Sequence, residues 1–290
     1  MANSISLAKV YTDLLDEVYQ KSALTANLES DASLAQKGAN ANEIIIPKIS
    51  MDGLADYSRN SGYVKGDVSL TWETVKFNYE RGRMFTVDDM DNEETQNIAF
   101  GRLAGEFIRT KVVPELDAFR FATYAAVTGA GKAEGTLATG ADVIAALRAA
   151  TSAMDEAEVP VEDRHLYITP TLYGLVQDMD TNKSREVLAR FEDVTQVPQT
   201  RFYSAIDLLD GTTSTEEKGG FKKASGAVDI NFEIIHKPAV LQFTKHAVPK
   251  IIAPAQNQDA DAWKYGYRNY GLCDTYENKA AGIYVHQKQA

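Results

Sequence analysis

The 290-residue chain carries 41 acidic and 30 basic residues, a formal net charge of -11, which argues against a protein whose task is to grip phosphate backbones. Its hydrophobic fraction of 44% and charged fraction of 24% are ordinary for a globular protein. No run approaches the roughly 20 apolar residues of a membrane span, and no basic segment followed by an apolar one opens the chain. We therefore expect a cytosolic product with no membrane partner. The single cysteine, Cys273, excludes an internal disulfide framework.

The N-terminal residues 1–42 predict an amphipathic helix followed by a linker. The apolar stripe of the helix consists of Leu7, Tyr11, Leu14 and Val18, at spacings of three and four residues. The sequence then becomes rich in Ser, Ala, Asn and Gly, which is typical of irregular backbone. This order indicates an arm that contacts another subunit.

The next segment predicts a long β hairpin. Residues 43–49 are rich in isoleucine and include Pro47, which has no N–H to donate and therefore indicates an edge strand. The return strand is expected over residues 68–79, and a connection as long as residues 50–67 is usually functional or disordered. Because two strands alone are at best marginally stable in water, we expect this hairpin to rest on something outside its own subunit.

The apolar positions of the return strand change phase near Thr74. Val68, Leu70 and Trp72 alternate with polar residues, but from Val75 onward the apolar positions shift by one. Since strand side chains alternate with a period of two, the shift moves the apolar set to the opposite face unless a bulge intervenes. The strand therefore either serves two packing surfaces or is an ordinary sandwich strand with a bulge.

An acidic run follows Arg81-Gly82-Arg83 and a short predicted strand at residues 84–87. Carboxylates such as Asp88 and Asp89 are favoured in the first turn of a helix by its exposed N–H groups and its dipole. The alternative is a calcium-binding loop, but the EF-hand pattern requires glycine and glutamate where Glu94 and Phe100 stand. The run therefore predicts a helix start.

A single helix is predicted over residues 92–126, which at about 1.5 Å per residue would span roughly 50 Å. Phe107, Leu116 and Phe119 lie on its predicted buried stripe. Pro114 removes one hydrogen bond of the helix and clashes with the preceding turn, so we expect a kink near Val113.

These segments, in this order, resemble the major capsid proteins of tailed bacteriophages with the Hong Kong 97-like fold. The resemblance is carried by Ile46-Pro47-Lys48-Ile49, Gly62-Tyr63-Val64-Lys65-Gly66-Asp67, Trp72-Glu73-Thr74-Val75, Arg81-Gly82-Arg83, residues 87–95 and residues 110–117. It covers most of the chain and is strongest over residues 43–120. It implies an α+β fold with an N-terminal arm (1–42), an extended loop formed by the β hairpin (43–87), a peripheral domain with a spine helix (88–135), an axial α/β domain (136–250) and a return to the peripheral domain (251–290).

Glycine-rich residues 128–135 predict a flexible joint. The joint resembles a phosphate-binding loop only superficially, because Ala126 and Ala133 occupy the places of the first glycine and of the magnesium-binding Ser or Thr. Beyond it, a helix capped by Thr139, a buried strand at residues 165–168 and a helix opened by Thr169-Pro170 predict the axial α/β module.

Two later segments complete the predicted architecture. Residues 208–227 are polar and glycine-rich, and predict a loop or hairpin. Near the C-terminus, Trp263, Tyr265 and Tyr267 alternate with polar residues, which predicts a strand whose aromatic face packs on the spine helix.

Catalytic motifs are largely missing from the sequence. The four histidines are His165, His236, His246 and His286, and none has a second ligand at a zinc-motif spacing. No Gly-x-Ser-x-Gly elbow occurs, although the members of a Ser/His/Asp triad need not lie close together in a sequence. We expect a structural protein rather than an enzyme, and no cofactor.

The resemblance implies a subunit that self-assembles into an icosahedral shell of hexamers and pentamers around packaged double-stranded DNA, without sequence-specific contact. Portal, scaffold or decoration proteins are the expected partners, and the expected location is the virion capsid, after synthesis in the bacterial cytoplasm. The expected assembly interface comprises Leu7, Tyr11, Leu14, Val18, Tyr57, Arg59, Tyr63, Lys65, Trp72, Arg81, Arg83, Asp88 and Asp89. The alternatives are an encapsulin-type nanocompartment shell and a soluble α/β enzyme with a site at residues 128–135.

Overall fold

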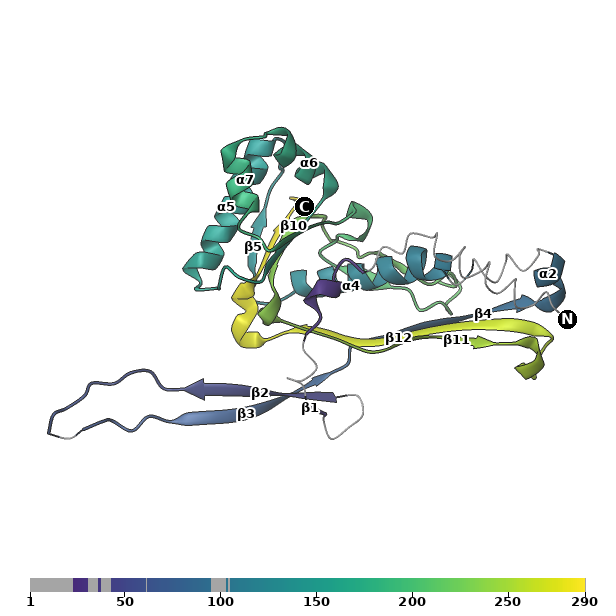
Figure 1. The fold of residues 1–290 in the computed structure, drawn as a ribbon, viewed down its shortest axis with the longest axis horizontal. Coiled ribbons are helices and arrows are strands. Elements are labelled where there is room, and N and C mark those ends of the chain that lie inside the picture. Colours follow the sequence, from purple (N-terminus) through teal and green to yellow (C-terminus); the bar gives the residue numbers. More distant parts are fainter. Residues whose placement is uncertain are drawn as a thin grey trace, which may run out of the picture.

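The computed structural model describes residues 23–30, 36–37, 43–60, 62–94, 103 and 105–289. Over these residues the strands form four sheets (Figure 1). A five-stranded sheet with helices makes one part of the molecule, a long three-stranded sheet lies beneath the helix α4 (Val113–Ala125), and a hairpin projects away from both. The predicted α+β class is confirmed.

The five-stranded sheet carries the larger hydrophobic core. Its strands, in spatial order, are β5 (Gly131–Glu134), β13 (Ile283–Gln287), β10 (Ile230–His236), β6 (Arg164–Ile168) and β7 (Asp193–Gln196). The helices α5 (Gly140–Glu156), α6 (Pro170–Asp178) and α7 (Asn182–Leu188) contribute Leu147, Val176 and Val187 to one cluster with Leu166 and Phe232 of the sheet. The predicted cap of α5 is confirmed, since Thr139 and Asp142 form a reciprocal capping box.

The three-stranded sheet has the order β11 (Val240–Ile252), β12 (Ala262–Thr275) and β4 (Tyr79–Asp88), all antiparallel. The helix α4 joins this sheet to the five-stranded one, because Phe121 and Tyr124 belong to a second cluster with residues of both sheets. The ring centroid of Phe121 lies 5.1 Å from that of Tyr167 and 4.9 Å from that of Phe202. Within the described residues, no helix is long and apolar enough to cross a membrane.

The buried face of α4 is rotated from the predicted stripe. Phe121 and Tyr124 are fully buried, whereas Phe107, Leu116 and Phe119 keep part of their surface exposed. The prediction that these three residues form the core was therefore wrong, because the buried face of the helix is turned away from the predicted stripe. A polar flank explains the error, because Asp117 and Arg120, which a periodicity argument assigns to solvent, are buried as well.

The predicted helix over residues 92–126 includes residues 95–102 and 104, which lie outside the described residues. Before it, α2 (Asp89–Glu94) begins at the acidic run, as predicted. The backbone preceding Pro114 is a π-helical turn, η3 (Ile108–Val112), in which the N–H of Val113 donates to the carbonyl of Ile108. The proline has no N–H for the carbonyl of Thr110, so the helix departs from α geometry at this point.

The hairpin sheet consists of β1 (Gln36–Lys37), β2 (Glu43–Met51) and β3 (Val68–Lys76). The predicted return strand over residues 68–79 ends at Lys76, and Tyr79 already belongs to β4 of the long sheet. Arg81-Gly82-Arg83 lies within β4 and does not interrupt it. Two short strands, β8 (Ile206–Leu208) and β9 (Phe221–Lys223), form the hairpin predicted at residues 208–227.

Two further expectations differ from the structure. The expected flexible joint at residues 128–135 contains β5, which pairs in parallel with β13, so Gly131–Glu134 are part of the five-stranded sheet. In addition, the boundary proposed at residue 250 does not follow the sheets, since β11 pairs with β12 in the long sheet and β13 lies in the five-stranded sheet. The pairing of these strands is long-range, so no local pattern of the sequence contains it.

Candidate assembly surfaces

The base of the hairpin is fixed to its own subunit. Ile44 and Ile46 of β2 and Val75 of β3 are buried against Leu241 and Leu272 of the long sheet. All three hairpin residues lie on one face, because Ile44 is paired with Val75 and Ile46 is two residues along the same strand. This face therefore packs inward.

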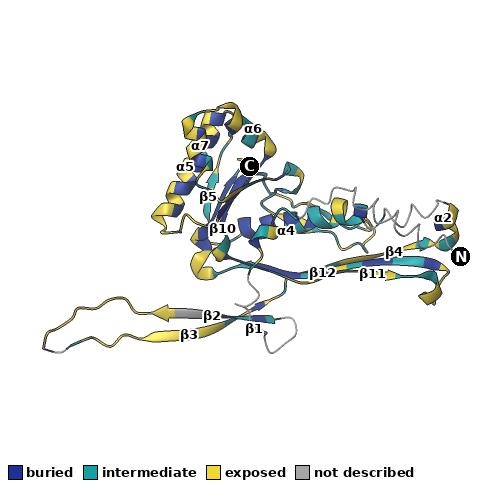
Figure 2. Cartoon of the chain, in the orientation of Figure 1, coloured by how far each residue is buried: buried dark blue, intermediate teal, exposed yellow. Residues whose placement is uncertain are grey.

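The opposite face of the hairpin carries exposed apolar side chains, and Figure 2 shows most of β3 as exposed. The exposed fraction is 69% for Met51 and for Val68, 52% for Leu70 and 49% for Trp72. The pairing of β2 with β3 has no register shift from Glu43–Lys76 to Met51–Val68. The phase change at Thr74 is thus not a bulge, and it marks the point where the apolar side chains change from the inner face to the outer face. We call Met51, Val68, Leu70 and Trp72 the outer strip.

The described part of the hairpin tip, residues 52–60 and 62–67, has a backbone contact and an aromatic contact within it. Ser58 and Gly62 exchange two backbone hydrogen bonds of 3.2 and 2.7 Å. The rings of Tyr57 and Tyr63 lie 4.8 Å apart at 59°, although both side chains are exposed. Arg59 and Lys65, which belong to the expected assembly interface, are exposed as well. The tip therefore exposes a pair of aromatic rings near charged side chains.

The chain at residues 24–30 is anchored inside the subunit by a buried carboxylate. Asp117 of α4 accepts hydrogen bonds from the backbone N–H of Leu24 (3.2 Å) and from the hydroxyl of Thr25 (3.1 Å), and pairs with Arg201 at 3.1 Å. Burial raises the pKa of Asp117, while these donors and Arg201 oppose that rise. The side chain of Arg120 also donates to Thr25. This stretch, which includes the turn η1 (Ala26–Leu28), thus belongs to the folded subunit.

The predicted arm residues Leu7, Tyr11, Leu14 and Val18 lie outside the described residues. The anchoring role of Asp117 was missed in the sequence, because a single aspartate in a helical pattern is indistinguishable from a solvent-facing one. Only the partners of Asp117, which lie more than 80 residues away in the chain, reveal it.

Arg81 and Arg83, predicted at an assembly interface, make contacts within the subunit. The Nε of Arg81 pairs with Glu115 at 2.7 Å, and its Nη2 donates to the carbonyls of Leu209 and Gly220. Arg83 is exposed and donates to the carbonyl of Glu217 at 3.0 Å. The two arginines hold residues 209–220 over β4.

The acidic pair Asp88 and Asp89 lies at the start of α2. Asp89 accepts a 2.8 Å hydrogen bond from the indole N–H of Trp263, and Asp88 accepts one from the backbone of Met90. Trp263 is therefore bonded to the helix start, while the ring of Tyr267, four residues farther along β12, meets that of Phe107 edge-on with 6.3 Å between centroids. This contact confirms that the aromatic face of β12 packs on the helix. Among the described residues no group of His, Cys, Asp and Glu is arranged to hold a metal ion.

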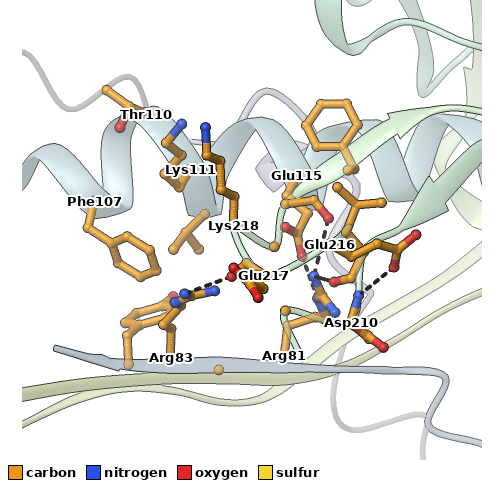
Figure 3. A pocket seen from close by; sticks show the side chains of 18 of the residues that line it. Arg81, Arg83, Phe107, Thr110, Lys111, Glu115, Asp210, Glu216, Glu217 and Lys218 are labelled. Atoms are coloured by element: carbon orange, nitrogen blue, oxygen red, sulfur yellow. Dashed lines mark hydrogen bonds and ion pairs between the residues drawn. The ribbon is translucent and has the colours of Figure 1, made fainter. Parts of the chain in front are cut away.

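A cleft of about 1110 Å³ lies between β4, the helix that contains η3 and the loop of residues 209–220 (Figure 3). Its floor is aromatic, since Phe85, Phe107 and Tyr267 line it, and Phe85 meets Phe107 edge-on at 4.8 Å. Charged residues of the helix and of the loop surround this floor. No pattern in the sequence predicted this cleft, because its walls come from three distant segments.

No protein-family model matches the chain, and no curated protein matches it either. Solved structures do match. The capsid structure of the cyanophage P-SCSP1u has a TM-score of 0.62 at 15% identity, with 93% of this chain and 89% of that chain covered. The capsid of Myoviridae phage XM1 has a TM-score of 0.59 at 8% identity, with 92% and 91% covered. The chain has a phage capsid fold.

A virus-like particle from Pyrococcus furiosus is also similar, with a TM-score of 0.57 at 11% identity over 99% of this chain and 100% of that chain. At these identities the likeness concerns the fold, and it is consistent with the resemblance seen in the hairpin and spine-helix motifs.

Proposed function

We propose that this protein is the major capsid protein of a tailed phage, a structural subunit that self-assembles into a closed icosahedral shell. The observation that carries the proposal is the outer strip, together with the capsid fold. Four large apolar side chains that face away from their own subunit are costly in water and are typical of an interaction surface. In a shell they would be covered by a neighbouring subunit.

In this proposal the subunits form hexamers and pentamers, and overlapping hairpins and N-terminal arms supply the binding energy. The shell would enclose double-stranded DNA without sequence-specific contact, which suits a subunit with a net charge of -11. Portal, scaffold or decoration proteins would complete the particle. Assembly would take place in the cytoplasm of the bacterial host.

A nanocompartment shell is the second candidate. The virus-like particle from Pyrococcus furiosus supports it, because that chain and this one cover each other almost completely. The two candidates differ in what the shell contains. A compartment would hold a protein, and a phage capsid would hold a genome.

The test is to express the full chain, purify it and record electron micrographs together with the protein and nucleic-acid content of the particles. Closed shells from this single chain support a shell function. Small, uniform shells that retain a co-purified protein would favour the compartment, whereas shells that take up DNA when phage packaging proteins are present favour the capsid. A protein that stays monomeric at every concentration and ionic strength tested would overturn both.

A hairpin variant makes this test specific. Replacing residues 51–65 with Asn-Gly removes the tip and one residue of the outer strip but no residue of the three core clusters. The variant should keep the circular dichroism spectrum of the subunit, apart from the lost strand residues, and should stop at monomers or small capsomers in velocity sedimentation. Full-size shells from it would show that the hairpin does not hold subunits together.

A further inference from the structure

The side chain of Asn27, in the turn η1, joins residues 24–30 to strands β6 and β7 of the five-stranded sheet. Its Nδ2 atom lies 3.3 Å from Nδ1 of His165 and 3.5 Å from a carboxylate oxygen of Asp193. Its carbonyl oxygen accepts a 2.6 Å hydrogen bond from the hydroxyl of Tyr167. Both ends of this amide are therefore bonded to the sheet.

The orientation of the Asn27 amide determines which nitrogen of His165 carries the proton. The carboxylate of Asp193 can only accept hydrogen bonds, so the NH2 group of the amide faces it, and the same group faces Nδ1 of His165. Nδ1 therefore accepts, and the neutral ring carries its proton on Nε2. That Nε2 atom is buried and has no hydrogen-bond partner among the described residues. The observed arrangement thus requires a neutral imidazole.

Charged groups from several elements surround His165. Asp163 precedes β6, Glu192 and Asp193 lie at the start of β7, and Lys237 begins the turn η5 (Lys237–Ala239). The three carboxylates favour the charged ring, but burial disfavours it more strongly, and the pKa of His165 is lowered from its ordinary 6.5. The exposed fraction of His165 is only 6%. When η1 detaches, water reaches the ring, and its pKa returns towards the ordinary value.

A proton on His165 is incompatible with the bond to Asn27. An N–H on Nδ1 would face the NH2 group of the amide, so two donors would meet. Asp193, the register partner of His165 on the parallel strand β7, is the adjacent acceptor. A cationic ring would compete with Asn27 for this carboxylate, because charge-assisted hydrogen bonds are the stronger ones. Protonation therefore removes one acceptor from the amide and introduces competition for the other.

We propose that His165 is a pH-sensitive switch that holds residues 24–30 on the five-stranded sheet when it is neutral and loosens them when it is protonated. These residues connect the predicted N-terminal arm to the folded subunit, so acid would weaken the attachment of the arm. The switch is a property of the subunit alone and does not rest on the proposed shell function.

Asp117, the other anchor of these residues, responds to pH in the opposite direction. Burial raises the pKa of its carboxyl, so the attached segment favours the protonated form and acid strengthens this anchor. The two effects are separated by a variant that changes His165 and leaves Asp117 in place. His165→Gln is such a variant, because its uncharged amide can accept from Asn27 at every pH.

The test is hydrogen exchange of the full chain, detected by mass spectrometry at about pH 7.5 and about pH 5.5, on either side of the ordinary histidine pKa. The N–H groups of Leu24 and Thr25 are bonded to Asp117, and that of Ser30 to the carbonyl of Gln242. Exchange in a peptide over residues 23–30 therefore reports on their attachment. The rates are corrected for the intrinsic pH dependence of amide exchange.

His286→Gln is the matched control. His286 is also a buried histidine, but its Nδ1 lies 3.0 Å from Nδ2 of Asn231 in β10. The ratio of the opening constants at the two pH values should be about tenfold larger in the wild type and in His286→Gln than in His165→Gln, because pH 5.5 is about one unit below the ordinary 6.5. Peptides of β10 should stay protected in all three proteins, since the opening is local.

A second measurement does not depend on replacing His165. In an NMR titration, the pKa of His165 should be higher in Asn27→Ala than in the wild type, because the amide donates to the neutral ring only. Asn27 is partly exposed, so this substitution leaves the subunit folded. An unchanged pKa of His165 in Asn27→Ala would overturn the proposed coupling even if circular dichroism showed that His165→Gln is unfolded.

The outcomes also separate the switch from the shell function. Equal ratios in the wild type and in His165→Gln, an equal reduction in His286→Gln, or loss of protection in β10 along with residues 23–30 would overturn the switch and leave the shell function standing. A wild type that forms no shells would overturn the shell function and leave the switch standing.

Discussion

Replacing Leu70 and Trp72 by serine should remove most of the energy that the outer strip contributes to assembly. An aromatic side chain buries about 150 to 250 Å², so the 49% of Trp72 that is exposed leaves roughly 100 Å² for a neighbour to cover. At about 25 cal/mol per Å² this contact contributes about 2.5 kcal/mol. The exposed half of Leu70 adds about 1 kcal/mol. Losing both costs a factor of about 300 in the association constant per docked hairpin.

The assay is velocity sedimentation over a series of subunit concentrations, with thermal unfolding of the unassembled subunit as a second measurement. Neither side chain belongs to a core cluster, so the free energy of unfolding of the isolated subunit should change by no more than about 0.5 kcal/mol. Ser69→Ala, on the inward-turned face of the same strand, is the matched control. Unchanged assembly of the double variant, with Ser69→Ala behaving alike, would refute the assignment of the outer strip to a subunit contact.

Three further predictions concern the subunit itself. Phe121→Ala should lower the free energy of unfolding by about 3 to 5 kcal/mol, because Phe121 is fully buried, and Phe119→Ala should cost clearly less; equal losses in urea denaturation would contradict the observed orientation of α4. Glu233 of β10 is fully buried, and neither carboxylate oxygen has a hydrogen-bond partner among the described residues, so burial raises the pKa of its carboxyl well above the ordinary 4.5. As the pH rises above about 4.5, the unfolded chain loses this proton and the folded chain keeps it, so the free energy of unfolding falls. Glu233→Gln has no carboxyl to titrate, so its free energy of unfolding should not show this fall between about pH 5 and 8. Parallel curves of stability against pH for the two proteins would contradict this prediction. Deleting residues 2–21 keeps the anchored residues 24–30, so the subunit should fold normally and assemble poorly, as judged by circular dichroism and sedimentation; normal shells in full yield would show that the arm is dispensable.

The elements that were predictable from sequence are those defined by local patterns. The cap of α5 depends on Thr139 and Asp142, three residues apart, and the start of α2 depends on an acidic run. The phase change at Thr74 correctly indicated two packing directions in one strand. In each case the residues that determine the structure are neighbours in the chain, so a single window of sequence contains them.

The features that could not be predicted depend on contacts between distant segments. The buried face of α4 includes Asp117, whose partners Leu24 and Arg201 lie on either side of it in the sequence, 93 and 84 residues away. A carboxylate that is paired in this way is stable in a core, but the pattern of one helix assigns it to solvent. The same holds for Arg81, because its partner carbonyls lie on a loop that follows it by more than 100 residues.

The outer strip and the net charge act against each other in the free subunit. Exposed apolar residues on β3, whose second edge pairs with no described strand, favour association with any other edge. A net charge of -11 opposes this through repulsion between subunits, which extends over a Debye length of about 8 Å at physiological ionic strength. Apolar contact acts only when surfaces meet, so it outweighs the repulsion only where the two surfaces fit closely. The balance therefore disfavours loose contacts between hairpins and favours those in which two surfaces fit closely enough to cover the outer strip.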